Sequence, residues 1–167
     1  MTGGSLRHSI LIATTITQLG IQLADQTCTV TSPDTRVHIA SKGTYRYPDV
    51  TVFCGDPVYL EDRMDTILNP VVLVEVTSPI TALLDCSDKL LEYLQIETLQ
   101  AYLLVSQHEP LIERYLRHES EDWLYSVGRG LDSAISIPEI GCTLSLAKVY
   151  QKVTFDEPDT DTEQHEE

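Results

Sequence analysis

Hydrophobic residues recur along the first part of the chain with two different spacings, and each spacing predicts a different element. Residues 5–24 repeat apolar side chains every three or four positions, which predicts a helix with Ser5 as its N-cap. Residues 27–31 and 36–40 instead alternate apolar and polar side chains on either side of Ser-Pro-Asp-Thr. This alternation around a turn predicts two strands joined as a hairpin.

The middle of the chain contains its most hydrophobic run. Residues 45–54 alternate like a strand, with Pro48 near the start, where a missing N–H donor is tolerated. Residues 55–69 are polar and charged, which predicts a loop. The continuous β-branched run at residues 71–77 is typical of a strand covered on both faces, as in the centre of an α/β sheet.

The remaining elements predict the fold class. The leucine spacing of residues 81–95 indicates a helix, with further strands and a short last helix, capped by Ser145, after it. These strands and the last helix are expected at residues 101–106, 111–117, 123–127, 135–137 and 146–151. The order predicts an α/β or α+β fold, in which helices flank a central mixed sheet.

Composition makes the chain most simply one domain with an acidic tail. Its 167 residues are enough for a core of its own over residues 1–155. Residues 156–167 hold seven acids and no Lys or Arg, so we expect them to be disordered. Without them the net charge changes from −15 to −8, with 19 acids against 11 bases. Such a body opposes loose phosphate binding, so a nucleic-acid role would need a local basic groove or a metal.

The sequence features that report on location favour the cytoplasm. No apolar run reaches the roughly 18 to 20 residues of a membrane span, and the amino terminus lacks a secretory pattern. The four cysteines form no Cys-x-x-Cys pair, and no histidine lies near them at zinc-ligand spacing. We expect all four to be reduced and structural, at positions Cys28, Cys54, Cys86 and Cys142.

Two acids and a lysine stand out as candidate chemistry. Glu75 lies inside the apolar run, and a carboxylate buried there must be protonated, paired or bound to a metal. On adjacent strands, the Cα atoms of Asp49 and Glu75 would lie about 5 Å apart, close enough for the acids to share a magnesium ion. Lys89 on the next helix would activate a water or stabilise developing negative charge.

Each of these residues also has an ordinary structural interpretation. Asp49 follows a proline and can be a turn acid, and Glu75 can be a strand-end acid that points to solvent. Lys89 can form a surface ion pair with Asp85 or Glu92, worth about 0.3–0.5 kcal/mol. Each interpretation is the more common one for its residue alone, but the three together favour a site.

Three motifs resemble a known family. They are Tyr-Pro-Asp-Val-Thr-Val at 47–52, Pro-Val-Val-Leu-Val-Glu-Val-Thr-Ser-Pro at 70–79, and Asp85-x-x-x-Lys89-x-x-x-Tyr93. They are similar to the Uma-two-type restriction endonucleases, and the similarity continues to about Phe155. The resemblance implies the PD-(D/E)xK nuclease superfamily, a restriction-endonuclease-like fold, and Mg²⁺-dependent cleavage of DNA, with Mn²⁺ as an alternative metal.

The resemblance also implies roles for single residues. Asp49 and Glu75 match the two acids of the motif and would hold the metal, with the carbonyl of Val76 as a further ligand. The usual lysine position, two residues after the second acid, falls at Thr77, which cannot replace it. The resemblance therefore assigns the lysine role to Lys89 on the following helix.

Two further residues are supporting candidates. Asp85 would orient Lys89 or approach the metal. His8 lies in the first turn of the first helix, where a surface or capping role is the default interpretation. Family members typically carry an upstream strand with a Tyr-Glu and a Gly-Glu pair. This chain begins at Met1 without it, so we expect either a start assigned too far downstream or the loss of an auxiliary metal-site acid.

Three functions are consistent with the sequence. The first is a metal-dependent endonuclease that hydrolyses DNA phosphodiester bonds. The second is a catalytically inactive interaction protein on the same fold, as a homodimer, which the acidic body and the absent upstream acid favour. The third is a metal-dependent hydrolase that acts on a small phosphoester.

Overall fold

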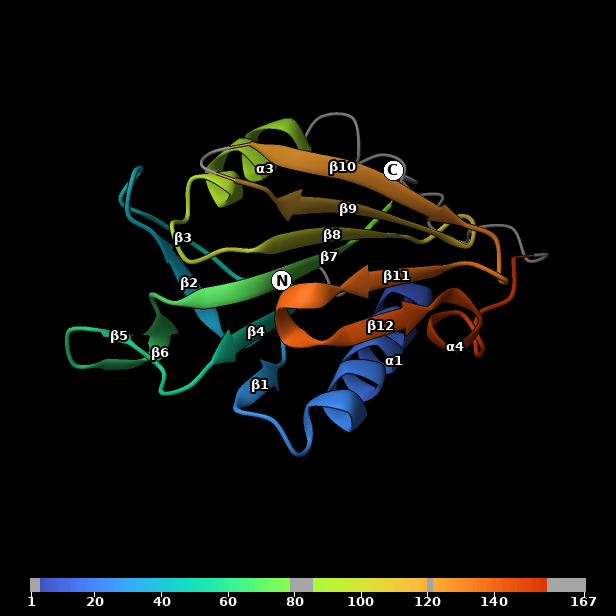
Figure 1. Cartoon of the computed structure of the whole chain (residues 1–167), viewed down its shortest axis with the longest axis horizontal. Helices are drawn as coiled ribbons and strands as arrows, with labels where there is room; N and C mark the ends of the chain where they lie inside the picture. Colours follow the sequence, from blue (N-terminus) through green and yellow to red (C-terminus); the bar gives the residue numbers. More distant parts are fainter. Residues whose placement is uncertain (1–3, 79–85, 120–121, 156–167) are drawn as a thin grey trace, which may run out of the picture.

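The computed structural model describes residues 4–78, 86–119 and 122–155, and it shows a mixed sheet with helices on its two faces (Figure 1). Its helices are α1 (Leu6–Leu23), α3 (Cys86–Leu94) and α4 (Leu146–Val149), with a 3-10 turn η1 (Pro138–Ile140). Its strands are β1 (Cys28–Thr31), β2 (Arg36–Ile39), β3 (Thr44–Arg46), β4 (Val50–Cys54), β5 (Tyr59–Leu60), β6 (Arg63–Ile67), β7 (Pro70–Thr77), β8 (Ala101–Ser106), β9 (Leu111–Arg117), β10 (Trp123–Arg129), β11 (Ala134–Ile137) and β12 (Cys142–Ser145).

A six-stranded sheet organises the molecule, with its strands in the order β1-β4-β7-β8-β9-β10. The pair β7 and β8 is parallel and the other neighbours are antiparallel, so the sheet is mixed. A second sheet, β3-β2-β6-β5, lies beside one end of it, and β11 and β12 form a separate hairpin (Figure 1). The predicted central mixed sheet flanked by helices is confirmed.

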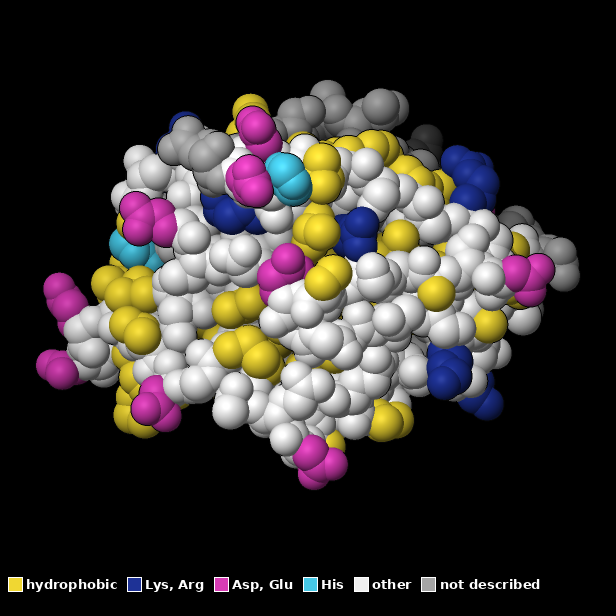
Figure 2. Space-filling model, in the orientation of Figure 1, with side chains coloured by type: hydrophobic (Ala, Val, Ile, Leu, Met, Phe, Trp, Pro, Cys, Tyr) yellow, Lys and Arg dark blue, Asp and Glu magenta, His cyan; other side chains and the backbone are white. Residues whose placement is uncertain are grey.

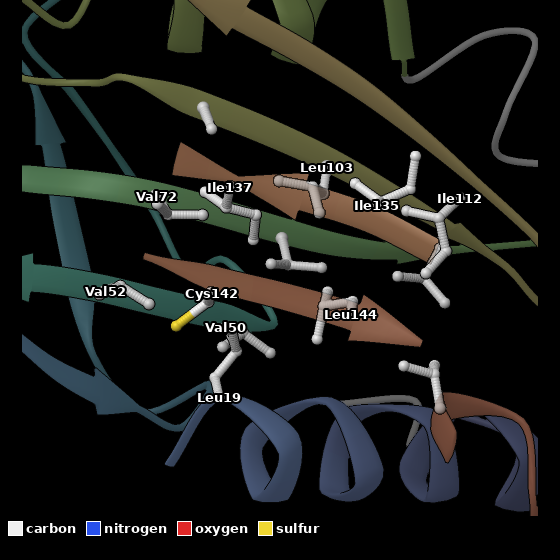
Figure 3. Packing of buried hydrophobic residues seen from close by; sticks show 14 of the residues in the cluster. Leu19, Val50, Val52, Val72, Leu103, Ile112, Ile135, Ile137, Cys142 and Leu144 are labelled. Carbon is white, nitrogen blue, oxygen red and sulfur yellow. The ribbon is translucent and has the colours of Figure 1, made fainter. Parts of the chain in front are cut away.

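Strand β7 is held from both sides because its alternate side chains enter two cores. Val72, Val74 and Val76 enter the core shared with α1 and the β11–β12 hairpin. Leu73 enters the second core, which α3 and the strands β2 and β6 complete. Figure 3 shows the first core from close by, between the main sheet, the hairpin and α1. Burial stabilises each such side chain by about 1.5–3 kcal/mol, so β7 is a rigid platform for any residue that it carries.

Helix α1 confirms both its predicted extent and its predicted cap. The side chain of Ser5 accepts a hydrogen bond from the N–H of His8, which satisfies a donor that the first turn leaves free. The buried side of the helix repeats every four residues, at Leu11, Thr15, Leu19 and Leu23. This stripe packs against β1, β12 and α4, and so the first turn of α1 is fixed relative to the main sheet.

The predicted hairpin of residues 27–31 and 36–40 is wrong in its pairing. Both strands exist, but β1 pairs with β4, and β2 pairs with β3 and β6. The expected strand at 45–54 is divided, because Pro48 has no N–H to donate and separates β3 from β4. The division lets β3 join the second sheet while β4 joins the main one.

The loop expected at residues 55–69 is also wrong, since it contains β5 and β6. Arg63, Met64 and Asp65 are exposed, and only the end of β6 is buried, at Thr66 and Ile67. The strand therefore shows no apolar alternation, and its partners, β2 and β5, hold it in place. Strand β12 was likewise not expected.

The other elements follow the prediction. Strands β7, β8 and β11, the antiparallel pair β9–β10 and helix α4 lie where they were expected, and α3 confirms the described part of the helix at 81–95. The expected acidic tail, 156–167, lies outside the described residues. Among the helices of the described ranges, none combines the length and the hydropathy needed to cross a membrane.

The cysteine prediction is wrong for two residues. Cys28 and Cys54 lie directly opposite each other in the β1–β4 ladder and form a disulfide. The sequence could not bring them together because it predicted that β1 pairs with β2. Cys142 is free and buried, as expected, whereas the side chain of Cys86 lies outside the described residues. Since disulfides are typical of oxidising compartments, cysteine usage no longer supports a cytoplasmic location, which stays a prediction.

Candidate active site

Asp49 and Glu75 lie side by side at the point where β4 begins. The register pairs Val50 of β4 with Val74 of β7, so the preceding Asp49 lies next to Glu75 across the ladder. Glu75 is only 8% exposed, and the side chain of Asp49 is 14% exposed. The interpretation of Glu75 as a solvent-facing acid is therefore wrong, and the predicted proximity of the two acids is confirmed.

The carboxylate of Asp49 accepts a backbone hydrogen bond from β7 that a neighbouring strand would otherwise accept. Its Oδ2 accepts a hydrogen bond of 2.7 Å from the backbone N–H of Val76, at a position that β4 does not reach. In an extended strand, the N–H and C=O of one residue point to the same side. The carbonyl of Val76 is therefore directed toward the edge that Asp49 occupies, as a ligand role would require.

The electrostatics of Glu75 indicate two acids that lack a sufficient counter-charge. Burial raises the pKa of Glu75 to about 7, and repulsion by Asp49 is the next largest cause. A hydrogen bond with the Asp49 carboxyl also raises this pKa, whereas the charge of Lys89 and a hydrogen bond from Tyr93 lower it. With this raised pKa, the Glu75 carboxyl keeps its proton up to near neutral pH, and a bound cation would replace that proton.

His8 reaches this pair from the first turn of α1. Its Nε2 lies 3.2 Å from Oδ2 of Asp49, and the imidazole is 24% exposed. The hydrogen bond to Asp49 is the main cause of the raised pKa of His8. The default interpretation of His8 as a surface or capping residue is wrong, because the side chain contacts the candidate site.

Three contacts that sequence reasoning missed hold the start of α1 at the end of β8. The hydroxyl of Ser5 donates to Oε1 of Gln107 at 2.9 Å. The guanidinium of Arg7 donates to the carbonyls of Gln107 at 3.2 Å and Thr154 at 3.0 Å. Since Gln107 follows β8, which is parallel to β7, these contacts fix His8 beside the end of β7. The residues are 100 or more positions apart in sequence, so no local pattern could have revealed these contacts.

Helix α3 presents two polar groups to Glu75 from the other face of the sheet. The hydroxyl of Tyr93 donates to Oε1 of Glu75 at 2.8 Å. Lys89 lies one turn earlier on the same side of the helix, and its charge acts on Glu75. Glu92, one of the acids considered as a partner for Lys89, accepts a hydrogen bond of 2.9 Å from Arg46. The charge of Lys89 therefore acts on Glu75, and its role in the candidate site stays a prediction.

Two other predicted positions, Thr77 and Asp85, add no charged group to the described part of the site. The hydroxyl of Thr77 donates to the backbone carbonyl of Val105 at 3.5 Å, and it brings no positive charge to the usual lysine position. Asp85 lies outside the described residues.

The donor set fits a magnesium ion. Over the described ranges, no three side chains of His, Cys, Asp or Glu gather into a metal-binding group. Magnesium needs less than that, because it is typically held by one or two carboxylates and keeps several waters. Asp49, Glu75 and the carbonyl of Val76 supply only oxygen atoms, which this ion prefers, and the raised pKa of Glu75 indicates an unmet need for positive charge.

The protonation of Glu75 predicts that the metal-free protein loses stability as the pH rises. The unfolded carboxyl releases its proton near pH 4.5, whereas the folded one keeps it up to about pH 7. The folded state therefore binds more protons between these values, and the free energy of unfolding falls there by about 3 kcal/mol, at roughly 1.4 kcal/mol per pKa unit. Glu75→Gln removes this contribution while His8 stays in place.

Urea unfolding of both proteins in EDTA at pH 5 and pH 8 measures the effect. Going from pH 5 to pH 8, the wild type should lose roughly 2–3 kcal/mol more than the Gln variant. Equal pH dependence in the two proteins would show that Glu75 is not held protonated in the folded state.

Comparison with known proteins finds a matching family model and two similar sequences. The model of the family "Uma2: Putative restriction endonuclease" matches residues 1–147. Two uncharacterized proteins of Synechocystis sp. are similar over most of their length. The protein slr1290 is 32% identical over 157 residues, which cover 93% of this chain and 80% of that protein. The protein sll1609 is 29% identical over 135 residues, which cover 81% and 76%.

A solved structure shares the fold. It is described as a putative nuclease belonging to DUF820 from Anabaena variabilis, with a TM-score of 0.71 and 16% identity over 89% of this chain and 82% of that one. At this identity the likeness concerns the fold alone. The family match, however, covers nearly all the described residues, including β4, β7 and α3, which carry the candidate site. On this ground the chain belongs to the Uma2 family.

Proposed function

We propose that this protein is a metal-dependent endonuclease of the PD-(D/E)xK type that hydrolyses DNA phosphodiester bonds. The observation that carries the proposal is the buried pair of Asp49 and Glu75, which the charge of Lys89 reaches from α3. A folded protein gains nothing from two adjacent buried carboxyls unless a proton or a cation joins them. Their position where β4 begins, beside the Val76 carbonyl of β7, supports a cation.

The residues of the site have different roles: some would bind the metal, one stabilises charge on the phosphate, and one orients a metal ligand. Asp49, Glu75 and the Val76 carbonyl would hold Mg²⁺ or Mn²⁺, which, when bound, supplies Lewis-acid charge and a water of lowered pKa. Lys89 stabilises the negative charge that develops on the phosphate oxygens and orients the attacking water. His8 hydrogen-bonds Oδ2 of Asp49, which keeps this carboxylate directed toward β7.

The charge of the surface supports a role for the cation in substrate binding. On the face drawn in Figure 2, Lys and Arg side chains stand apart from one another and form no continuous basic stripe. The net charge is −15. A DNA backbone would therefore be held by a few local contacts, and the cation would offset the repulsion between the two acids and a phosphate.

The proposal is tested by plasmid cleavage with matched variants. Wild-type protein should convert supercoiled plasmid to nicked or linear forms in Mg²⁺ or Mn²⁺ and not in EDTA. Asp49→Asn keeps the shape of the side chain but removes its charge, and it should lower the cleavage rate at least about 100-fold. Asp65→Asn is the control, because Asp65 is exposed and pairs with arginines.

Two results would contradict the proposal. One is cleavage that persists in EDTA. The other is equal cleavage by the wild type and the Asp49→Asn variant, since activity without Asp49 would belong to a contaminant.

A second candidate is a catalytically inactive interaction protein, as a homodimer. It is favoured by the edge strand β10, which leaves Leu124, Tyr125 and Val127 between 43% and 54% exposed. An open edge with apolar side chains is a surface on which a second strand can pair. Light scattering that gives a dimer, together with no heat on titration with Mg²⁺ or Mn²⁺, would favour this function over the first.

A further inference from the structure

We infer that Tyr93 is a positioning residue that fixes the carboxylate of Glu75 for metal binding, an inference that rests on the proposed function. The residues assigned to the site so far come from α1, β4, β7 and the first part of α3. Tyr93 adds a neutral donor on the last turn of α3, and it acts on a metal ligand rather than on the metal or the substrate.

The contact is specific to one oxygen atom. The phenol hydroxyl lies 2.8 Å from Oε1 of Glu75, and both side chains are buried. The carboxylate of a glutamate is attached through three rotatable bonds and can turn, whereas one that accepts a hydrogen bond from a fixed donor cannot turn without losing it. Oε2 is then the oxygen without this contact, and it stays available to a bound cation.

The donor itself is held rigidly. Tyr93 is fully buried, and its ring packs edge-on against Tyr102 of β8, with centroids 5.2 Å apart. It belongs to the core that also contains Leu73 of β7 and Leu99, which follows α3. The hydroxyl therefore has a fixed position relative to β7, the strand that carries Glu75.

Lys89 and Tyr93 both act on Glu75 from one face of α3. Lys89 and Tyr93 are four residues apart, so they project from the same side of α3. The packing of Tyr93 thus fixes the rotation of α3 about its own axis, and with it the side of the helix from which the charge of Lys89 acts on Glu75. Loss of the ring would disturb both groups, but loss of the hydroxyl alone disturbs only the orientation of Glu75.

An ordinary role in the core is the alternative, because any buried tyrosine needs a partner for its hydroxyl. The two roles differ in what Tyr93→Phe changes. This variant removes one oxygen atom and leaves the ring packed, so it should fold, which circular dichroism and thermal unfolding verify. A purely structural tyrosine would affect only stability, whereas a positioning residue would also affect metal affinity and turnover.

The test measures Mn²⁺ binding by calorimetry and plasmid cleavage under identical conditions. For Tyr93→Phe we expect metal affinity or kcat to fall about 10- to 100-fold, the range typical of partners that orient a metal ligand, with KM for DNA unchanged. Tyr125→Phe is one control, since it removes a phenol–glutamate hydrogen bond of the same kind, from exposed Tyr125 to Oε1 of Glu113. Tyr150→Phe is the other, because its buried hydroxyl binds the carbonyls of Ser106 and Leu111.

The outcomes separate this inference from the proposed function. If the wild type binds Mn²⁺ and cleaves DNA, and the Tyr93→Phe variant does both equally well, the role of Tyr93 is overturned and the proposed nuclease function stands. Equal losses in all three Phe variants would also overturn it, because they would reflect a general loss of stability. A wild type that neither binds Mn²⁺ nor cleaves DNA would overturn the function and the inference together.

Discussion

Glu75→Gln is expected to lower Mg²⁺-dependent plasmid cleavage at least about 1,000-fold while leaving the protein folded and no less stable. The amide has the shape of the carboxyl and can still accept the hydrogen bond from Tyr93. It cannot supply the negative charge that a cation needs, and removing a metal ligand costs several kcal/mol of transition-state stabilisation, at 1.36 kcal/mol per tenfold in rate. Glu75→Ala should be equally inactive but less stable, because it leaves a cavity.

The control for this prediction is Glu113→Gln. Glu113, on strand β9 and away from Asp49, also accepts a phenol hydrogen bond, but from Tyr125, whose side chain is exposed. Cleavage rates are measured beside calorimetric Mn²⁺ titrations and thermal unfolding. Unchanged cleavage by a folded Glu75→Gln protein would end the assignment of this site.

Lys89→Met is expected to lower cleavage about 100- to 1,000-fold while Mn²⁺ binding is largely retained. Met has a similar length and helix propensity, so α3 should stay intact. The lost ammonium no longer stabilises charge on the phosphate, an effect of the same order as the loss of one preorganised donor. Since Lys89 lowers the pKa of Glu75, metal affinity at neutral pH should fall a few-fold, because more of the carboxyl is protonated.

The comparison of binding with turnover separates Lys89 from the metal ligands. Lys148→Met, at an exposed position of α4, is the control for the loss of one positive charge. Full activity in the Lys89 variant would leave Asp49 and Glu75 without a third catalytic residue. Loss of Mn²⁺ binding as complete as in Glu75→Gln would instead mean that Lys89 maintains the structure of the site.

Elements with strong local patterns could be predicted from the sequence, and the pairing of strands could not. The β-branched run of β7 reports burial on both faces, and the spacing of α1 reports one buried side. The partner of β1, by contrast, lies more than 20 residues away on β4, and β6 has mostly exposed side chains. Pairing depends on which strand satisfies the free backbone groups, and side-chain alternation carries no information about that.

The same limit applies to the site. The polar residues at Asp49, Glu75 and Lys89 stand out by their placement in or beside apolar runs. The contacts of His8 with Asp49 and of Ser5 with Gln107 join positions 41 and 102 residues apart. An ordinary first-turn histidine gives no sign of such a contact, so its default interpretation failed.

By itself, the sequence determined the central strand, the two flanking helices and which three charged residues deserve a chemical explanation, because hydrophobic spacing and misplaced charge are local properties. Only the tertiary structure decided that Asp49 and Glu75 lie side by side where β4 begins, that His8 and Tyr93 bind them from opposite faces of the sheet, and that Cys28 and Cys54 are joined. These facts depend on strand register and on the rotation of α1 and α3, which are fixed by packing across the whole core.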